Sequence, residues 1–410
     1  MSIGLFLLLA IAASVAVRLA PILPERLRLP ASLAVLLAFL IWAPFTLDGF
    51  RFPQLTRVAV WVLVVMGLNI LTGYNGQISL GHGALVAAGA YTTAILMDGS
   101  EQLSFVDATP WPFWASIIVS GGLVAILGLL LGIPALRLSG PYLAIATLTL
   151  VISFPVIIRK YDGFTGGGLG LKVAPSERAP PNFLDGVLNL NEWNYFLALF
   201  TAVVMLLLAW SILRGPMGRA FMAVRDSEVA AAAMGINVAR TKVTAFTISA
   251  FYAGIAGALF TQVNGTITPE SISIIDSINF LVAVVIGGLA SIMGAVIGAA
   301  AIIYLPSDAP DLIGQIPGLQ TDIVERAPGA IRGLLVILVM LLMPGGLAGF
   351  TRRLLRLRPA DAMEGLRAAP TAFGSRARET GRQLSSLWDT RPWNRQGPSD
   401  PDSTDGEEGG

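Results

Sequence analysis

The stretch "WNYFLALFTAVVMLLLAWSIL" at residues 193–213 contains no charged residue from end to end. The hydrocarbon core of a bilayer is about 30 Å thick and is crossed by about 20 consecutive apolar helical residues. The stretch therefore predicts a transmembrane helix. Of the 410 residues in the chain, 54% are hydrophobic and 13% are charged, whereas about a quarter are charged in soluble domains. We expect an all-α polytopic membrane protein, because the alternating segments of a β-barrel are not seen.

Apolar runs recur along the chain and predict about ten transmembrane helices, some of them broken at glycines or re-entrant. The runs are 3–20, 31–46, 58–71, 82–97, 113–134, 142–158, 193–213, 243–265, 280–305 and 331–350. The runs 58–71 and 82–97 are too short to cross a membrane alone, and the glycine-rich "TGYNGQISLG" separates them. Basic residues do not precede the first run, as they would in a cleaved signal peptide. We therefore expect a retained first span, with its C-terminal end in the cytoplasm beside Arg18, Arg26 and Arg28.

The charges of the loops predict their orientation, because cytoplasmic loops carry an excess of Lys and Arg. The basic residues of segment 214–242 are Arg214, Arg219, Arg225, Arg240 and Lys242. This segment should be cytoplasmic, whereas 98–112 and 266–279 have no Lys or Arg and should be external. Arginines just after residue 351 place the C-terminal tail in the cytoplasm. We expect a transmembrane domain over 1–351 and a disordered cytoplasmic tail over 352–410.

This orientation requires an irregular span in the C-terminal half of the chain. From a cytoplasmic segment 214–242, three simple crossings would leave the tail outside. One of the apolar regions after it must therefore be re-entrant or divided in two. The best candidate is 280–305, because Gly287, Gly288 and Gly294 interrupt its middle.

Two glycine-containing segments resemble each other. Both "QISLGHGALVAAGA" (77–90) and "LASIMGAVIGAA" (289–300) place a serine shortly before a helix start made of small residues. Paired glycine-broken segments in two halves of a chain indicate a substrate path near the bilayer midplane. Alternatively, the likeness is that of any two glycine-rich spans.

Polar residues beside these breaks are the candidates for a translocation path, because groups freed at a break tend to line a cavity. They are Asn69, Gln77, Ser79, His82 and Ser291. His82 begins the half-helix after the first break, where it contacts either a substrate or a nearby backbone carbonyl.

Several classes of chemistry find no support in the sequence. The chain has no cysteine and one histidine, which excludes disulfides, thiolate metal sites and multi-histidine metal centres. "TGGGLGL" (165–171) lacks the Gly-Lys-Ser/Thr of a phosphate-binding loop. We expect no catalytic residue, metal, cofactor or nucleic-acid partner, and any energy for uphill transport should come from another subunit. The rival is a self-sufficient carrier or channel, against which the missing carboxylates of the apolar runs argue.

The stretch "GRAFMAVRDSEVAAAAMGI" (218–236) predicts a helix, a turn and a short helix. Asp226 or Ser227 can cap the short helix, Glu228 lies in its first turn, and Gly235 is placed to end it. A helix of about seven residues is marginal alone in water, so something must dock on it. The expected docking face is Ala231, Met234 and Ile236, with Arg219, Arg225 and Glu228 at its rim. The alternative occupant of that face is the surface of this chain itself.

This stretch resembles the cytoplasmic coupling loop of ABC importer permeases, and more narrowly that of branched-chain amino-acid permeases of LivM type. The residues that carry the resemblance are Gly218, Arg219, Ala220, Arg225, Glu228, Ala230, Ala231, Met234, Gly235 and Ile236. Five further segments match that family in order: "GYNGQISLGHGALVAAGAY" (73–91), "SGPYLAIATL" (139–148), "TGGGLGL" (165–171), "VVIGGLASIMGAVIGA" (284–299) and "PGGLAGF" (344–350). The resemblance covers roughly residues 30–350, and "GQISLGHG" favours the LivM over the LivH partner type.

The resemblance implies the ABC importer permease fold and a subunit of the bacterial inner membrane. It implies a second homologous permease, two cytoplasmic ATPase subunits that bind ATP, and an extracytoplasmic binding protein that delivers Leu, Ile or Val. The same family includes importers of urea and short amides, which remain alternative substrates. The coupling residues that it implies are Gly218, Arg219, Arg225, Asp226, Glu228, Ala230, Ala231, Met234 and Gly235.

Overall fold

The computed structural model describes residues 52–97, 111–138, 140–181 and 188–313, together with Gly333, Gly346 and Gly349. Within these ranges, five helices are long and apolar enough to cross a membrane. They are α3 with its continuation η2 (Phe52–Tyr74), α5 (Phe113–Ala135), α6 (Pro141–Lys160), α8 (Leu190–Arg214) and α11 (Val238–Asn264). The chain is a multi-pass, mainly helical membrane protein, as the sequence predicts.

The remaining predicted elements fall partly outside this region. The runs 3–20 and 31–46, most of 331–350, and the tail 352–410 lie outside the described residues. The total of about ten spans and the division of the chain at residue 351 therefore stay predictions.

Run 58–71 is part of a full-length span, so the prediction that it is too short to cross alone is wrong. Helix α3 (Phe52–Leu68) continues into a π-helical turn, η2 (Asn69–Tyr74), and together they form 23 residues. The apolar pattern stops at Arg57 in the sequence. A long arginine side chain in the first turns of a span can nevertheless extend to the membrane surface, so the helix continues past it. Arg57 therefore lies inside the transmembrane helix, one residue before the apolar run from which the span was predicted.

Two helix breaks interrupt the centre of the fold. The first is the non-helical segment 75–81, after which α4 (His82–Met97) begins. The second separates α12 (Ile274–Gly287) from α13 (Ile292–Ile313), which confirms that region 280–305 is divided.

Backbone geometry explains the position of the second break. Gly288 has φ 111° and Ala290 has φ 54°, values in the left-handed half of the φ range that end the helix. A Cβ on Gly287 would overlap the carbonyl of Gly294. Because glycine carries no Cβ, α12 and α13 can pack backbone against backbone at this corner.

Helix α11 is the centre of the described packing, and it contacts α3, α4 and α5 through small residues. Ser120 Oγ donates to the Gly89 carbonyl at 2.8 Å and lies 3.2 Å from that of Gly254, which joins α5, α4 and α11. A Cβ on Gly257 would overlap the Val86 carbonyl. Small residues permit such close approach where water supplies no driving force for association. Ala250, Gly254 and Ala258 follow one another at intervals of four residues and so share one face of α11. This face of small residues packs against other helices of this chain.

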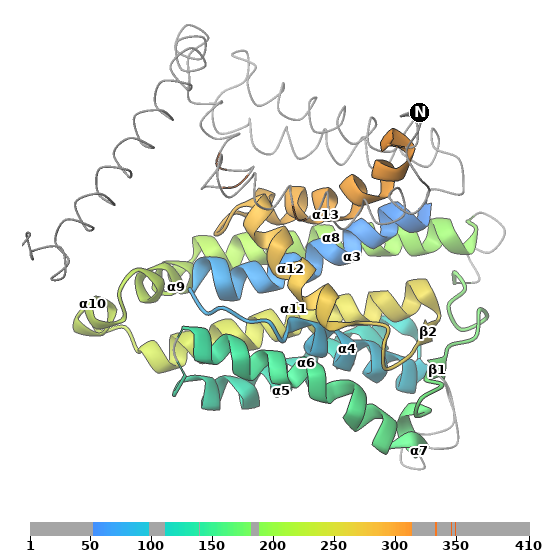
Figure 1. Cartoon of the computed structure of the whole chain (residues 1–410), viewed down its shortest axis with the longest axis horizontal. Helices are drawn as coiled ribbons and strands as arrows, with labels where there is room; N and C mark the ends of the chain where they lie inside the picture. The colour runs from blue at the N-terminus through green and yellow to red at the C-terminus, as the bar shows by residue number, and fades with distance from the viewer. Residues whose placement is uncertain are drawn as a thin grey trace, which may run out of the picture. The chain divides into compact units, whose positions relative to one another are not determined.

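The two ends of the described helices carry different structures (Figure 1). At one end lie α9 (Pro216–Asp226) and α10 (Glu228–Ala233), which connect α8 to α11 and form the predicted helix, turn and short helix. At the other end, β1 (Leu171–Lys172) pairs antiparallel with β2 (Thr266–Ile267), near the short α7 (Asp162–Thr165). We call these the α9–α10 end and the β1–β2 end.

Arg178 fastens the loop that follows β1 to the end of α11. Its Nη1 donates to the Gln262 carbonyl at 3.2 Å, while Gln262 Nε2 donates to the Arg178 carbonyl at 2.9 Å. Burial lowers the pKa of Arg178 from its ordinary value. The pair fixes the β1–β2 end against the central helix.

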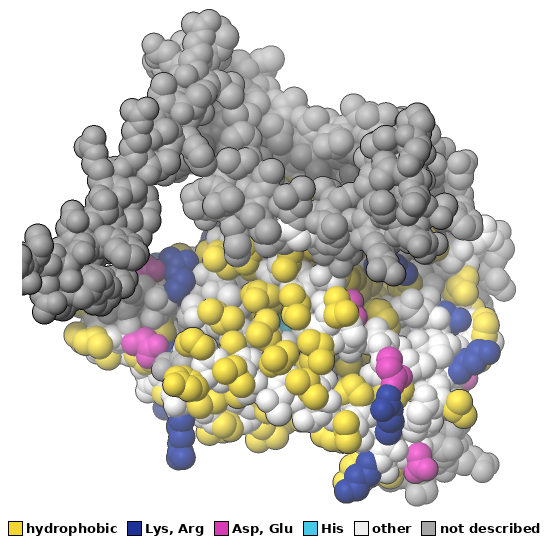
Figure 2. All heavy atoms as spheres, in the orientation of Figure 1, with side chains coloured by type: hydrophobic (Ala, Val, Ile, Leu, Met, Phe, Trp, Pro, Cys, Tyr) yellow, Lys and Arg dark blue, Asp and Glu magenta, His cyan; other side chains and the backbone are white. Residues whose placement is uncertain are grey.

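The outer helices α5, α6 and α8 turn large apolar side chains outward. Examples are Trp114, Ile118, Ile145 and Phe200, each more than half exposed. Figure 2 shows hydrophobic side chains over the middle of the visible face, with charged side chains gathered toward its two ends. Such a band with polar ends fits helices that face lipid or another membrane subunit.

Candidate functional site

Helix α9 folds back on the end of α8 and is anchored by two buried side chains. Helix α8 ends at Gly215, and Pro216 occupies the first turn of α9, where its missing N–H costs nothing. Phe221 and Val224 are 1% and 2% exposed. Glycine is required at position 218, because a Cβ there would overlap the Leu213 carbonyl.

Helix α10 has the caps that its sequence predicts. Ser227 Oγ accepts the Ala230 N–H at 3.2 Å, so Ser227 rather than Asp226 is the cap. Glu228 lies in the first turn, and Gly235 ends the helix with φ 82°. The next residues start α11, where Asn237 caps through its side chain.

The two faces of α10 have different surroundings. Ala231 is 3% exposed because it packs against this chain, whereas Val229 is 82% and Met234 is 83% exposed. Of the other predicted coupling residues, Gly218 is buried and Ile236 is half-buried. Those at the surface are Arg219, Arg225, Asp226, Glu228, Ala230 and Gly235. Val229 was not named among the predicted coupling residues, although its neighbours Glu228 and Ala230 were, and all three are exposed.

Arg225 connects α9 to the first helix break. Its Nη1 donates to the Gly73 carbonyl at 3.1 Å, and a Cβ on Gly76 would lie 2.9 Å from Arg225 Cγ. Asp226 holds the guanidinium through Oδ1, at 2.9 Å from Nε and from Nη2. The position of the break is thereby tied to the position of α9.

A second connection joins α10 to the same break. Glu228 Oε1 lies 2.6 Å from Lys242 Nζ, and the Lys242 carbonyl accepts a hydrogen bond from Gln77 Nε2 at 3.1 Å. The Lys242 side chain is 12% exposed, so this ion pair is less screened by solvent than most surface pairs. The segment 214–242 thus contacts both ends of the segment 73–77.

Asn69 joins the two breaks to each other. Its Nδ2 donates to the Ser291 carbonyl at 2.9 Å, and its Oδ1 accepts the Ala290 N–H at 2.9 Å. Ser291 Oγ in turn accepts the Gly294 N–H at 3.1 Å in the first turn of α13. One amide therefore satisfies backbone groups that the second break removes from helical pairing.

Several buried polar side chains of the first break have no hydrogen-bond partner among the described residues. They are the amide of Asn75, the Oγ of Ser79 and both ring nitrogens of His82. The Oγ of Ser249 on α11 is a further buried atom without a partner in this region. His82 is 0% exposed, and a Cβ on Gly67 would lie 3.4 Å from its Nε2. The predicted alternative contact of His82 with a backbone carbonyl is not found within the described ranges.

Unpartnered buried polar groups are costly, at about 1–3 kcal/mol each. A cluster of them in a helix break is therefore unexpected if the segment serves packing alone. The predicted path residues divide accordingly. Asn69, Gln77 and Ser291 make hydrogen bonds that connect elements, whereas Ser79 and His82 do not.

Comparisons with known proteins identify the family to which the chain belongs. The sequence profile of the family described as "Branched-chain amino acid transport system / permease component" matches residues 51–344. The "High-affinity branched-chain amino acid transport system permease protein LivM" of Escherichia coli K12 is 32% identical over 349 residues, covering 80% of this chain and 77% of LivM.

Two further permease proteins are similar to this chain at lower identity. The corresponding LivH protein of Escherichia coli K12 is 26% identical over 317 residues, covering 73% of this chain and 94% of LivH. The "Autoinducer 2 import system permease protein LsrC" of Salmonella choleraesuis is 27% identical over 183 residues, covering 42% of this chain and half of LsrC. No solved structure shows a significant match. The chain therefore belongs to the family of permease components of branched-chain amino acid transport systems, and within it resembles the LivM type.

Proposed function

We propose that this chain is a membrane-spanning permease subunit of an ABC importer that translocates branched-chain or related hydrophobic amino acids. The observation that carries the proposal is the direct connection between segment 214–242 and the first helix break. Arg225 bonds Gly73, and Gln77 bonds the carbonyl of Lys242. A force applied to α9 and α10 from outside the membrane would therefore reach the polar centre of the chain.

The chain would be driven by two ATPase subunits that bind ATP, while it carries no nucleotide site or catalytic residue of its own. The exposed Val229 and Met234 supply an apolar contact for an ATPase. Arg219 and Glu228 stand at its rim, where charged side chains set the specificity and rate of association. Segment 214–242 would then lie in the cytoplasm, and the arginines just after residue 351 support the same side for the tail 352–410.

Movement would pass from the loop to the path in two steps. Displacement of α9 shifts Gly73 through Arg225, and Asn69 transfers that shift to Ala290 and Ser291 at the second break. Both breaks are then displaced together. Ser79 and His82, which have no hydrogen-bond partner in the described part of the chain, would meet substrate when the path opens.

The partners follow from the family. LivM and LivH relatives are both named as permease proteins of one transport system, which supports a pair of homologous permeases. A binding protein outside the inner membrane would deliver the substrate, and membrane lipid would surround the pair. Urea or short amides remain alternative substrates, since the relative LsrC is named for a cargo that is not an amino acid.

Reconstitution in proteoliposomes tests the proposal. The chain, its permease partner, the ATPases and the binding protein should together accumulate labelled leucine only with ATP. Omission of the ATPases should abolish uphill uptake. Uphill uptake by the chain alone without ATP would contradict the proposal and favour a self-sufficient carrier. ATP-dependent uptake of urea but not leucine would retain the importer and change its substrate.

A further inference from the structure

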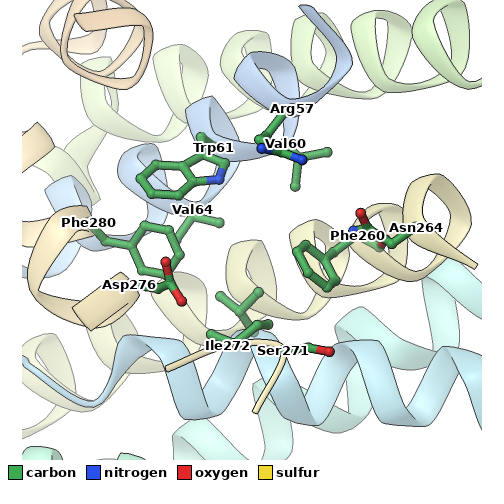
Figure 3. Close-up of a pocket in the computed structure, with 11 residues that line it drawn as sticks. Arg57, Val60, Trp61, Val64, Phe260, Asn264, Ser271, Ile272, Asp276 and Phe280 are labelled. Carbon is green, nitrogen blue, oxygen red and sulfur yellow. Dashed lines mark hydrogen bonds between the residues drawn. The ribbon is translucent and has the colours of Figure 1, made fainter. Parts of the chain in front are cut away.

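A cavity of about 240 Å³ lies between α3, α11 and the start of α12 (Figure 3). Its lining includes Arg57 from the first turns of α3, Asn264 from the last turn of α11, and Asp276 from the first turn of α12. These ends belong to the β1–β2 end, opposite the α9–α10 end. Pockets for drug-sized ligands measure about 300–1,000 Å³, so this cavity suits a smaller molecule.

Two opposite charges line this cavity, and they come from different helices. Arg57 has no hydrogen-bond or ion-pair partner among the described residues. Asp276 is held in place because its Oδ2 accepts the Ser273 N–H at 2.9 Å and the Ser273 hydroxyl at 2.8 Å. Both bonds use Oδ2, which leaves Oδ1 for another donor. Figure 3 shows Arg57 and Asp276 on different walls, with open space between them.

The remaining walls are mainly apolar and aromatic. The ring of Trp61 meets that of Phe280 edge-on, with centroids 4.7 Å apart and an interplanar angle of 69°. Val60, Val64 and Ile272 add aliphatic surface. Apolar walls with a few fixed polar groups are typical of sites for small ligands.

We propose that this cavity is a binding site for a small α-amino acid zwitterion with an apolar side chain. Arg57 binds the carboxylate, Asp276 binds the ammonium group, and the wall around Trp61 and Phe280 accepts the side chain. Both polar contacts are charge-assisted, which makes them roughly twice as strong as neutral hydrogen bonds. A neutral cargo such as urea leaves both charges unmatched. The assignment rests on the proposed function in that the cargo is an amino acid, and it adds where that amino acid is recognised.

Part of the cavity lining comes from α3 and α4, the helices that precede and follow the first helix break. Val64 and Val86 line the cavity, and the neighbouring Gly83 N–H donates to Ser277 Oγ at 2.9 Å, which ties the start of α4 to α12. His82, the preceding residue, is fully buried. A ligand in the cavity would therefore lie near the bond that ties the start of α4 to α12.

The absence of cysteine from the chain permits a direct binding assay. Ser271→Cys places a thiol on the cavity lining, and its reaction with a methanethiosulfonate reagent is followed in the full chain held with its subunits in membrane vesicles. L-leucine at about ten times its Kd should slow labelling about tenfold, because labelling reports the free fraction. Urea and 4-methylpentanoate, which lacks the ammonium group, should not slow it.

Variants identify the residues responsible. Arg57→Met and Asp276→Asn, each combined with Ser271→Cys, should lose the protection by leucine. Arg159→Met removes an arginine that pairs with Glu270 away from the cavity, and it should keep protection. Ser120→Ala removes the buried bonds that join α5, α4 and α11, away from the cavity lining, and it should also keep protection. This second control separates loss of charge from loss of folding.

The outcomes distinguish this site from the proposed function. Unchanged labelling with leucine, or protection that persists in both Arg57→Met and Asp276→Asn, overturns the zwitterion site. ATP-dependent leucine uptake without protection removes the site and keeps the importer. Protection by leucine in vesicles that show no ATP-dependent uptake supports the site and removes the importer.

Discussion

The two glycine breaks look alike in sequence but are stabilised in different ways. At the second break, Ser291 bonds the start of α13, and Gly287 packs directly on Gly294. At the first, Arg225 of α9 bonds the Gly73 carbonyl in η2, and Gln77 bonds the Lys242 carbonyl of α11. Segment 75–81 also contains buried polar groups without partners among the described residues. The second break is thus a closed corner, while the first is held by bonds to neighbouring elements, namely segment 214–242 through Arg225 and Lys242, and α6 through Thr147.

This difference indicates which break moves. A corner closed by backbone packing can be displaced only as a unit, because close-packed interiors do not deform continuously. A segment held by hydrogen bonds to neighbouring helices follows a displacement of those helices, and α9 is the one of them that is not among the membrane-crossing helices. The comparison can therefore be tested by disturbing each break, and the bonds between them, one at a time.

The largest effect is expected at the second break. Gly287→Ala places a Cβ against the Gly294 carbonyl, where no flexible side chain can move aside. Overpacking costs about 1–3 kcal/mol and occasionally more, and we expect the upper end, with little folded protein recovered. Gly122→Ala in α5 is the control, because a Cβ there has nothing within 4 Å. Thermal unfolding of purified protein measures both, and equal stability of the two variants would show that the corner is not closed.

Asn69→Ala should cost less but affect both breaks. It removes the bonds to Ser291 and Ala290 and leaves buried backbone groups unpaired, at about 1–3 kcal/mol. Asn264→Ala loses only a local bond at an exposed position and should stay within about 0.5 kcal/mol of the parent. Chemical unfolding in micelles gives the comparison. A loss no greater in Asn69→Ala than in the control would contradict the joining of the breaks.

The extent to which these features were predictable depends on how local they are. The helix breaks, the cap near Ser227 and the stop at Gly235 follow from short-range chemistry, and the structure has them where predicted. The start of α3 was missed because Arg57 ends the apolar run without ending the helix.

Long-range contacts were not predictable. The bond from Asn69 to Ser291 joins residues 222 positions apart, and Arg57 and Asp276 line one cavity only because α3 and α12 both lie beside it. Polar type and a nearby glycine indicated Asn69 and Ser291 as candidates. Their pairing required the fold. The burial of Ala231 likewise depends on which face of α10 the chain covers.

Arg225→Ala should reduce transport with little effect on stability. It removes the bond from α9 to Gly73. Because the Arg225 side chain is about one-third exposed, water replaces part of that bond, and the loss of stability should stay below about 1.4 kcal/mol. We expect ATP-dependent uptake to fall by up to about tenfold, since 1.4 kcal/mol is about a factor of ten in the equilibrium that couples α9 to the break. ATP hydrolysis by the assembled complex should continue.

Arg240→Ala is the matched control for this prediction, because the exposed Arg240 side chain makes no hydrogen bond or ion pair with the described residues. Uptake and hydrolysis are measured side by side in the same proteoliposomes. If Arg225→Ala transports as well as Arg240→Ala, the first break does not depend on α9. If both variants lose hydrolysis as well as uptake, the loop serves assembly rather than transmission of movement.

The smallest effect on stability is expected from Ser79→Ala, and it is the sharpest test of the first break. Ser79 Oγ is buried without a partner among the described residues. Its removal should leave stability unchanged or raise it by about 1 kcal/mol. Thr56→Ala, in which the lost hydroxyl bonds its own helix at 2.8 Å, is the control. A hydroxyl that serves packing alone predicts unchanged uptake in both variants. A hydroxyl that meets substrate predicts slower uptake in Ser79→Ala only, in a protein at least as stable as the parent, which no loss of folding can explain.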